Sequence, residues 1–585
     1  GPSSGGGFAN PILNAFFLLP NYSPYNANGT PNISAPDFPA GGLYNPIAIA
    51  QLDKNQNSTV KGVGTVNGEY KFLPNLKLTS KLGVDYNNLE ENSYNNPFMG
   101  DGRNDGGRAF QYYTRYFNWV ATNLLDYKWD ILKNNDLVAN ITAGYEAQKS
   151  KGYFLSVRND NLPANTDINY AAAGSTPKTA SGNASDYSFA SILALGDVSY
   201  KGRYVLSGSF RRDGSSRFGA NKQYGNFWSV GGSWNLDQED FIKDIAVINQ
   251  LKLRASYGVN GNAGIGNYDW RPLYGYGYNY NNQPGSAPST VGNENLTWET
   301  NKPLDLGLDI SVLHNRLNVT VEYYNRKTSN LLLNKPLSRT SGFSSFVDNV
   351  GSMVNKGYEV SLSGTPVVAG DFRWDASFNI ATNQNKITSL VDNQDQISGS
   401  FIRRVGQDIQ SFYLREWAGV NPANGDPLWY TDATHANTSN IYATSGRAIV
   451  GSASPKQFGS LGSTLTFKGI SLDGLLYYNF GNYVQDTWAR YTQGDGFGAS
   501  FNKVKSQLNR WQNPGDITNT PRPVYGGNKN ASESSTRFLY KGDYIRLRDL
   551  TLGYSLPKSL LSRIKVDNAN LYVRGSNIWT WTKDK

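Results

Sequence analysis

The sequence predicts an all-β fold and, within that class, one large antiparallel transmembrane β-barrel. The first observation is composition: 61 Gly, 38 Tyr, 26 Phe and 13 Trp among 585 residues, with aromatic residues favouring strands and glycine favouring turns. The second is a series of about sixteen runs in which apolar and polar side chains alternate. The third is that very short and very long connections follow one another along the chain.

The alternating runs give the expected strands in chain order. These are 59–70, 76–87, 113–129, 136–149, 187–200, 203–213, 226–236, 250–258, 298–312, 316–326, 356–364, 372–382, 458–468, 470–480, 542–556 and 569–582. In 544–557 the apolar positions change parity between Leu547 and Leu550, which predicts a bulge at Arg548 and Asp549. We therefore assign 1–585 to one partial barrel. Residues 1–58 are expected to form an extracellular loop that leads into the first strand, and 59–585 the strands with their long loops.

The connections predict a barrel with two different ends. Segments such as "YKGR", "LHNR" and "FKG" are tight turns, whereas 259–297, 327–355, 383–457 and 481–541 are long. Loops of that length are uncommon in compact soluble domains, but outer-membrane barrels have short turns at one end and long loops at the other. A β-propeller would show a repeated period, which is absent. A stack of β-sandwiches would have shorter strands.

Each strand has an apolar face and a polar face, as 304–327 illustrates. Leu304, Leu306 and Leu308 share one face, and Asp305 and Asp309 share the other. A soluble sheet over an oily core gives the same alternation. However, the lumen of a barrel with this many strands is too wide for side chains to fill. We therefore expect the polar face to line water and the apolar face to contact lipid. The charged residues assigned to the luminal face are Lys252, Arg254, Asp305, Asp309, Glu322, Glu359, Arg373, Asp375 and Asp473.

Tryptophans near the strand ends suggest girdles at the two membrane interfaces. Packing within loops or between neighbouring strands is the alternative explanation. The residues in question are Trp119, Trp129, Trp228, Trp234, Trp298, Trp374 and Trp579.

Composition excludes several classes of function. The chain has no Cys and only two histidines, His314 and His435, so a disulfide framework, a zinc site and a catalytic triad are not expected. The paired acids show no recognisable geometry for hydrolysis, and we predict no enzyme activity, cofactor or metal. Although the net charge is +9, the 55 basic and 46 acidic residues are interspersed, which argues against nucleic-acid binding. Mean hydropathy is −0.51, and no apolar run approaches the ~18 residues of a spanning helix.

The segment 269–285 is the strongest candidate for contact with a ligand. Its tyrosines alternate with glycine and asparagine, and tyrosine offers flat apolar rings and hydroxyls at a low conformational cost. A self-packed loop or a docking surface for a lipoprotein is the alternative. The candidate ligand-binding residues are Trp270, Tyr274, Tyr276, Tyr278 and Tyr280, followed by Trp429, Tyr430 and Trp511 on the same grounds.

Several ordered segments resemble the SusC/RagA family of TonB-dependent outer-membrane transporters. They include "SGSFRRDGSSRFG" (207–219), "GNFWSVGGSWNLDQEDFI" (225–242), "LKLRASYGVNGNAGIGNY" (251–268), "NVGSMVNKGYEVSL" (349–362) and "YIRLRDLTLGYSLP" (544–557). The resemblance covers nearly the whole chain, but a plug domain, a TonB box and the first strands of such a barrel are not recognised in it.

The resemblance implies a plugged barrel of about 22 strands in the outer membrane of Bacteroidetes. It also implies import of oligosaccharides or peptides, a SusD-like surface lipoprotein as partner, and energy from TonB with ExbB and ExbD. Two alternatives stay open at this point. One is a passive porin or adhesive barrel, and the other is a secreted all-β protein that binds or hydrolyses carbohydrate.

Overall fold

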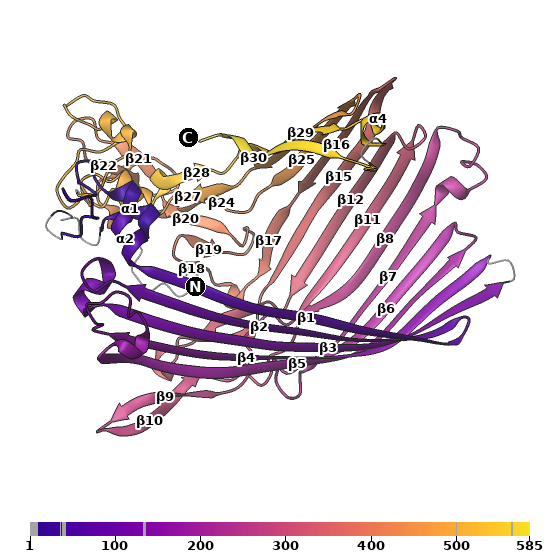
Figure 1. Ribbon diagram of the computed structural model, residues 1–585, viewed down its shortest axis with the longest axis horizontal. Coiled ribbons are helices and arrows are strands. Elements are labelled where there is room, and N and C mark those ends of the chain that lie inside the picture. The colour runs from indigo at the N-terminus through magenta and orange to yellow at the C-terminus, as the bar shows by residue number, and fades with distance from the viewer. Residues whose placement is uncertain are drawn as a thin grey trace.

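One large antiparallel sheet dominates the computed structural model, which describes residues 10–34, 37, 43–132, 136–498, 500–562 and 565–584 (Figure 1). Its strands are β1 (Lys54–Leu73), β2 (Leu76–Asn95), β3 (Arg108–Leu132), β4 (Leu137–Asp160), β5 (Thr176–Tyr200), β6 (Tyr204–Ser215), β7 (Tyr224–Asn235), β8 (Ile248–Asn262), β11 (Glu299–Val312), β12 (Leu317–Ser329), β15 (Ser352–Ala369), β16 (Phe372–Thr382), β17 (Gln384–Ser389), β25 (Gln457–Phe467), β26 (Ile470–Phe480), β29 (Tyr544–Ser555) and β30 (Asn570–Thr582).

The sheet is an antiparallel meander in which, β17 apart, each strand pairs with the next one along the chain in this sheet. Strand β17 continues the ladder along β15 beyond the end of β16. Among the described residues no ladder joins β30 to β1, so the curved sheet is open along these two edges. The fold class is thus the predicted all-β class, in the form of an open barrel wall.

Shorter elements lie in the connections. The short strands are β9 (Leu273–Tyr280), β10 (Gln283–Thr290), β13 (Leu332–Pro336), β14 (Ser345–Asn349), β18 (Gln396–Ser398), β19 (Phe401–Arg403), β20 (Ser411–Arg415), β21 (Trp417–Val420), β22 (Pro427–Tyr430), β23 (Thr438–Ser439), β24 (Arg447–Ser452), β27 (Tyr483–Gln485) and β28 (Leu539–Lys541). The α-helices are α1 (Pro11–Phe17), α2 (Pro46–Leu52), α3 (Ala489–Thr492) and α4 (Lys558–Leu561). No helix in the described part of the chain is long and apolar enough to span a bilayer.

Each of the sixteen predicted ranges coincides with a strand of the large sheet, but several strands are longer than predicted. β4 continues to Asp160, although its predicted range ended at 149. β5 begins at Thr176, although its predicted range began at 187. In "KTASGNASD" polar and small residues occupy both faces of β5. Alternation of apolar and polar residues identifies only the part of a strand that has one apolar face. The polar extensions were therefore missed.

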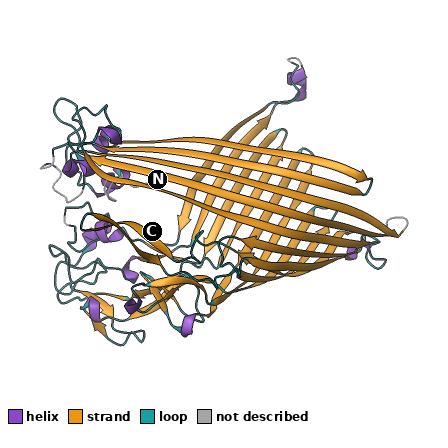
Figure 2. Cartoon of the chain, turned by 90° about the horizontal axis from the view of Figure 1, so that it is seen from below, coloured by secondary structure: helices purple, strands orange, loops and turns teal. Residues whose placement is uncertain are grey.

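The two ends of the sheet differ as predicted. Tight turns close one end, such as the turn in which Lys201 and Gly202 adopt φ values of 50° and 66°. Most of the long connections and helices gather at the other end (Figure 2). The predicted bulge is confirmed, because the register of β29 against β26 skips Arg548. Within the predicted N-terminal segment 1–58, residues 1–9, 35–36 and 38–42 lie outside the described residues.

The buried apolar side chains of the described residues form several small clusters at the loop end. One cluster contains Phe218, Phe227, Leu296 and Trp298. Trp298 is only 8% exposed and lies 5.0 Å, centroid to centroid, from Phe218. It therefore packs under loops and does not face a membrane interface, which decides between the two explanations for this tryptophan. Trp129 and Trp579 are 49% and 51% exposed, and they keep the girdle assignment as a prediction.

Candidate functional site

Cross-strand pairing gives the sheet one apolar and one polar face over most of its width, because directly paired residues share a face. One row of paired residues consists of Leu251, Ile310, Val319, Leu362, Phe378, Leu461, Leu476, Leu547 and Trp579. A row on the opposite face consists of Lys252, Asp309, Thr320, Ser361, Asn379, Ser460, Tyr477, Arg546 and Thr580. The alternation within single strands thus becomes a property of the whole sheet.

Three of the predicted polar-face residues meet in one ion-pair cluster. The guanidinium of Arg254 on β8 lies 3.0 Å from Asp309 on β11 and also pairs with Glu322 on β12. Thr320 donates a hydrogen bond of 3.0 Å to the second carboxylate oxygen of Asp309. One cation thus neutralises two carboxylates from two neighbouring strands, which links three strands on the polar face.

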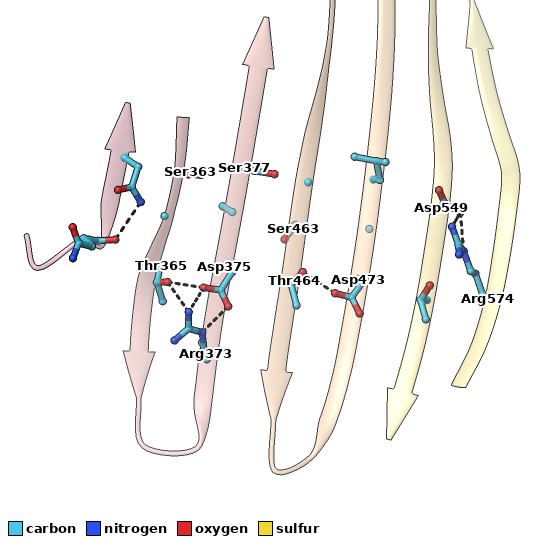
Figure 3. A pocket seen from close by; sticks show the side chains of 18 residues that line it. Ser363, Thr365, Arg373, Asp375, Ser377, Ser463, Thr464, Asp473, Asp549 and Arg574 are labelled. Carbon is cyan, nitrogen blue, oxygen red and sulfur yellow. Dashed lines mark hydrogen bonds and ion pairs between the residues drawn. The ribbon is translucent and has the colours of Figure 1, made fainter. Parts of the chain in front are cut away.

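A second group of charges surrounds a polar hollow of about 690 Å³ near the tight turns (Figure 3). Arg373 pairs with Asp375 on the same strand at 2.6 Å, and Thr365 donates to Asp375 at 2.5 Å. Asp473 accepts a 2.7 Å hydrogen bond from Thr464. The hollow therefore combines groups of both charge signs with several hydroxyls, which suits hydrated polar solutes.

The same hollow contains an ion pair that the sequence analysis missed, between Arg574 on β30 and Asp549 on β29, at 2.6 Å. The predicted bulge at Arg548 turns the side chain of Asp549 toward the polar face. Arg574 alternates with Leu571 and Val573, as the predicted polar residues do with their apolar neighbours. The alternation of 569–582 would thus have identified Arg574.

Asp305 and Glu359 lie with Glu322 around a neighbouring hollow of about 600 Å³. Glu322 and Glu359 are direct cross-strand partners, an arrangement that is unfavourable for two like charges. Arg326 also lines this hollow, and Arg254 reaches Glu322 from the other side. Lys252 pairs in register with Asp309 on the polar face.

The predicted ligand-binding tyrosines form a separate hairpin, β9–β10, that projects from the barrel wall (Figure 1). Tyr276 and Tyr280 are 85% and 84% exposed, and Tyr274 and Tyr278 are 59% and 53% exposed. The register skips Gly277, which has a φ of 90°. Because one extra residue reverses the alternation, Tyr274 and Tyr276 share one face and Tyr278 and Tyr280 the other.

Trp270 lies at the base of this hairpin and is held against the protein. Its indole nitrogen donates a 3.1 Å hydrogen bond to the carbonyl of Ser216, and its ring packs against the cluster around Trp298. The guanidinium of Arg271 lies 4.6 Å from the ring centroid. Trp270 therefore anchors the base of the hairpin, and the four tyrosines of the hairpin are exposed to solvent.

The candidates in the 383–456 and 481–541 loops differ in their exposure. Trp429 is 0% exposed, with its ring against Trp417 at 5.7 Å and Tyr442 at 5.4 Å. Trp511 is 8% exposed and donates a 2.9 Å hydrogen bond to the carbonyl of Pro422. Both tryptophans hold the loops together in this structure, and this burial keeps them out of the contact surface proposed below.

Tyr430 has a different environment, which involves His435, one of the two histidines of the chain. The ring of His435 stacks on Tyr430 with centroids 4.1 Å apart. The Nε2 atom of His435 lies 3.0 Å from the carboxylate of Glu416. The side chain of His435 is exposed, at 45%, and also has two specific neighbours, which no local sequence pattern indicated.

Two ionisable groups within the loops, Asp426 and Lys503, have surroundings that shift their pKa. Asp426 accepts hydrogen bonds from Lys529 at 2.9 Å and from Asn440 at 3.0 Å, with Arg522 3.6 Å away. Burial by itself raises the pKa of Asp426, but these hydrogen bonds and charges lower it below the usual 3.8. Burial lowers the pKa of Lys503 to about 8. Among the described residues no group of His, Cys, Asp or Glu is arranged to hold a metal ion.

Comparisons with known proteins agree with this architecture. A family model described as "TonB dependent receptor-like, beta-barrel" matches residues 3–578. The chain is 29% identical to TonB-dependent receptor P3 of Formosa agariphila, over 99% of this chain and 59% of that protein. It is 26% identical to TonB-dependent receptor SusC of Bacteroides thetaiotaomicron, over 91% of this chain and 54% of that protein.

A solved structure, the RagAB peptide transporter, superposes with a TM-score of 0.86 and 26% identity. The match covers 96% of this chain and 62% of that one. In its "open-open" state the RagAB peptide importer superposes with a TM-score of 0.87 and 26% identity, over 97% of this chain and 62% of that chain. The chain thus spans about three fifths of the length of these relatives.

Proposed function

Because the chain belongs to the TonB-dependent receptor-like β-barrel family, we propose that it forms the barrel of an outer-membrane transporter that imports oligosaccharides or peptides. Its relatives are transporters and not enzymes, and two-faced strands are what a barrel between lipid and water needs. The carboxylates and guanidinium groups face the passage, and the aliphatic rows face lipid.

The observation that carries the proposal is the continuous polar row across the sheet. It runs from Lys252 on β8 to Thr580 on β30 and mixes hydroxyl, amide and charged groups. Groups of both signs, as at Arg254 and Arg373, suit neutral or zwitterionic solutes better than strongly charged ones. Sugars and short peptides meet this requirement.

The tyrosine hairpin is proposed as an early contact for the imported molecule. Tyr276 and Tyr280 expose most of their surface on opposite faces of the hairpin. Rings of this kind stack on sugars or on peptide side chains. Tyr430, next to His435, is a further candidate at the loop end.

The partners proposed from the relatives are a SusD-like surface lipoprotein and the TonB–ExbB–ExbD machinery. SusC is a TonB-dependent receptor, and RagAB is a peptide transporter. Dependence on energy from TonB distinguishes the proposed active transporter from a passive porin or an adhesive barrel.

Uptake in the native host tests the proposal. Labelled mixtures of peptides and of oligosaccharides are offered to wild-type cells and to a strain that lacks the gene. We expect the deletion to abolish uptake of one mixture, and an uncoupler of the proton-motive force to have the same effect in wild-type cells. Uptake that depends on the gene but not on the uncoupler would indicate a passive channel. Unchanged uptake of both mixtures would contradict the proposed cargo.

A further inference from the structure

The apolar face of the sheet ends, on the loop side, in a patch of four lysines: Lys302 on β11, Lys327 on β12, Lys356 on β15 and Lys386 on β17. Each is exposed. Lys302 precedes Leu304 and Leu306 by two and four residues and so shares their face. The cations therefore lie on the face proposed to contact lipid and not on the polar face.

The register brings these lysines together. Lys302 is the direct cross-strand partner of Lys327. Lys327 pairs with Val354, which pairs in turn with Lys386. Lys356 occupies the next position on the same face, two residues from Val354. With strands about 4.8 Å apart, the row from Lys302 to Lys386 spans roughly 14 Å.

These like charges have no counter-ion in the described part of the structure. None of the four lysines makes an ion pair there, although Lys61, Lys77 and Lys149 on other strands do. Like charges placed directly opposite each other destabilise a strand pair, so an external anion would relieve the repulsion.

A hollow of about 660 Å³ adjoins the patch. Lys356 and Lys456 line it, together with the rings of Tyr323 and Tyr358, whose centroids lie 5.2 Å apart. Asp408 is the acidic residue of the lining, and its carboxylate accepts hydrogen bonds from Ser454 and from the backbone of Gln410, both at 2.8 Å. The lining of the hollow thus includes two lysines that make no ion pair with any described residue, and two aromatic rings.

The height of the patch matches the edge of a bilayer. From Lys302 to Val312 the strand advances ten residues, which is about 34 Å along the strand. At the usual tilt of about 40° this is about 26 Å along the barrel axis, close to the ~25 Å apolar band of an outer-membrane barrel. The ammonium groups therefore reach headgroup level, and the leucines below them reach acyl chains.

We propose that this lysine patch binds the phosphate of an acylated lipid of the outer leaflet. The phosphate lies among Lys302, Lys327, Lys356 and Lys386, and its acyl chains lie along the leucine rows. A phosphate supplies the negative counter-charge for the four ammonium groups, and the apolar face below accommodates the acyl chains.

Native mass spectrometry of the detergent-purified protein tests this with lipid A, a phosphorylated and multiply acylated glycolipid. The variant K302Q/K327Q/K356Q/K386Q is expected to lose lipid A affinity at least about tenfold. A control that removes the same charge from exposed lysines in connections, K222Q/K505Q/K558Q/K565Q, is expected to bind as wild type. The charge-conserving K302R/K327R/K356R/K386R is expected to retain binding, and it shows that loss in the glutamine variant is not misfolding.

Two further measurements distinguish the phosphate of a lipid from free inorganic phosphate. Lipid A treated with phosphatase is expected to bind wild type no better than the glutamine variant binds intact lipid A. Millimolar inorganic phosphate is expected not to displace the lipid. Equal binding of intact and dephosphorylated lipid, equal binding by the glutamine variant, or displacement by inorganic phosphate would each overturn the proposal.

Discussion

At the scale of single residues, Arg254 has the clearest task, because it neutralises two carboxylates that the strand pairing holds close together. Its replacement leaves Asp309 and Glu322 unpaired on the polar face. Since these side chains are partly exposed, water screens much of the effect.

We therefore expect Arg254→Ala to lower barrel stability by on the order of 1 kcal/mol. The heat-induced mobility shift of the folded barrel on a denaturing gel measures it, as a midpoint a few degrees lower. Arg326→Ala removes a nearby cation that makes no ion pair among the described residues and is the matched control. An equal shift for both variants would mean that the pairing at Arg254 contributes nothing specific.

Asp426 predicts a pH dependence in the loops. Its folded-state pKa lies below 3.8, so the unfolded loop binds the proton more tightly. The stabilisation by Lys529 and Asn440 is therefore present above pH 3.8 and is lost as the pH falls through the lower, folded-state pKa.

Pepsin digestion measures this, with rates normalised to an unfolded reference protein at each pH. We expect cleavage within 481–541 to be faster at the lower end of the pepsin range than just above pH 3.8. Asp426→Asn removes the titrating group, and its cleavage should be fast at both pH values. A wild-type rate that does not change with pH would argue against the stated role of Asp426.

At the scale of elements, glycines allow a tyrosine to reach across a strand. Gly357 on β15 pairs with Tyr324 on β12, whose hydroxyl donates a 3.0 Å hydrogen bond to the carbonyl of Thr382 beyond it. A Cβ atom at Gly357 would overlap that same carbonyl oxygen. Tyr478, Gly459 and Asn379 repeat the arrangement, so the glycine is required by close packing and not by a turn.

Gly357→Ala is expected to destabilise the barrel by about 1–3 kcal/mol, because backbone and not a flexible side chain must move. Gly208→Ala on β6 is the control, since its new methyl would come no nearer than 3.7 Å to another atom. The folded fraction recovered after refolding in detergent is the measurement. A Gly357→Ala barrel as stable as Gly208→Ala would refute the packing argument.

Substitutions in the tyrosine hairpin are expected to lower uptake without lowering the stability of the barrel. Tyr276 and Tyr280 are 85% and 84% exposed, so Tyr276→Ser with Tyr280→Ser should leave the thermal midpoint unchanged. If the proposed contact is correct, uptake should fall several-fold at low substrate concentration, since each stacked ring contributes about 0.5–1.5 kcal/mol. Uptake at the wild-type rate would remove this hairpin from the ligand path.

At the scale of the whole molecule, the proposal depends on which face of the sheet meets lipid. Leu461 and Ser460 are neighbours on β25 and lie on opposite faces. Spin labels at Leu461→Cys and Ser460→Cys in a reconstituted bilayer distinguish the faces, because oxygen concentrates in lipid and polar relaxing agents in water. We expect the oxygen effect to be larger at 461 and the effect of the polar agent to be larger at 460. The reverse order would overturn the transporter and lysine-patch proposals together.

Much of the fold was predictable from the sequence. The sixteen strand ranges, the unequal ends of the sheet and the bulge at Arg548 follow from apolar alternation and turn residues. The extensions of β4 and β5 were missed because polar residues occupy both faces there. The split of the four tyrosines was missed because the bulge at Gly277 depends on its pairing with β10.

The two faces of the sheet follow directly from the order of apolar and polar residues, because side chains alternate along any strand. Which residues meet depends on the folded chain as a whole. Arg254 reaches Asp309 and Glu322 across 55 and 68 residues, and Trp429 is buried between Trp417 and Tyr442. The physical reason is that the register between strands and the packing of loops depend on turns, bulges and neighbouring segments, which no local pattern contains.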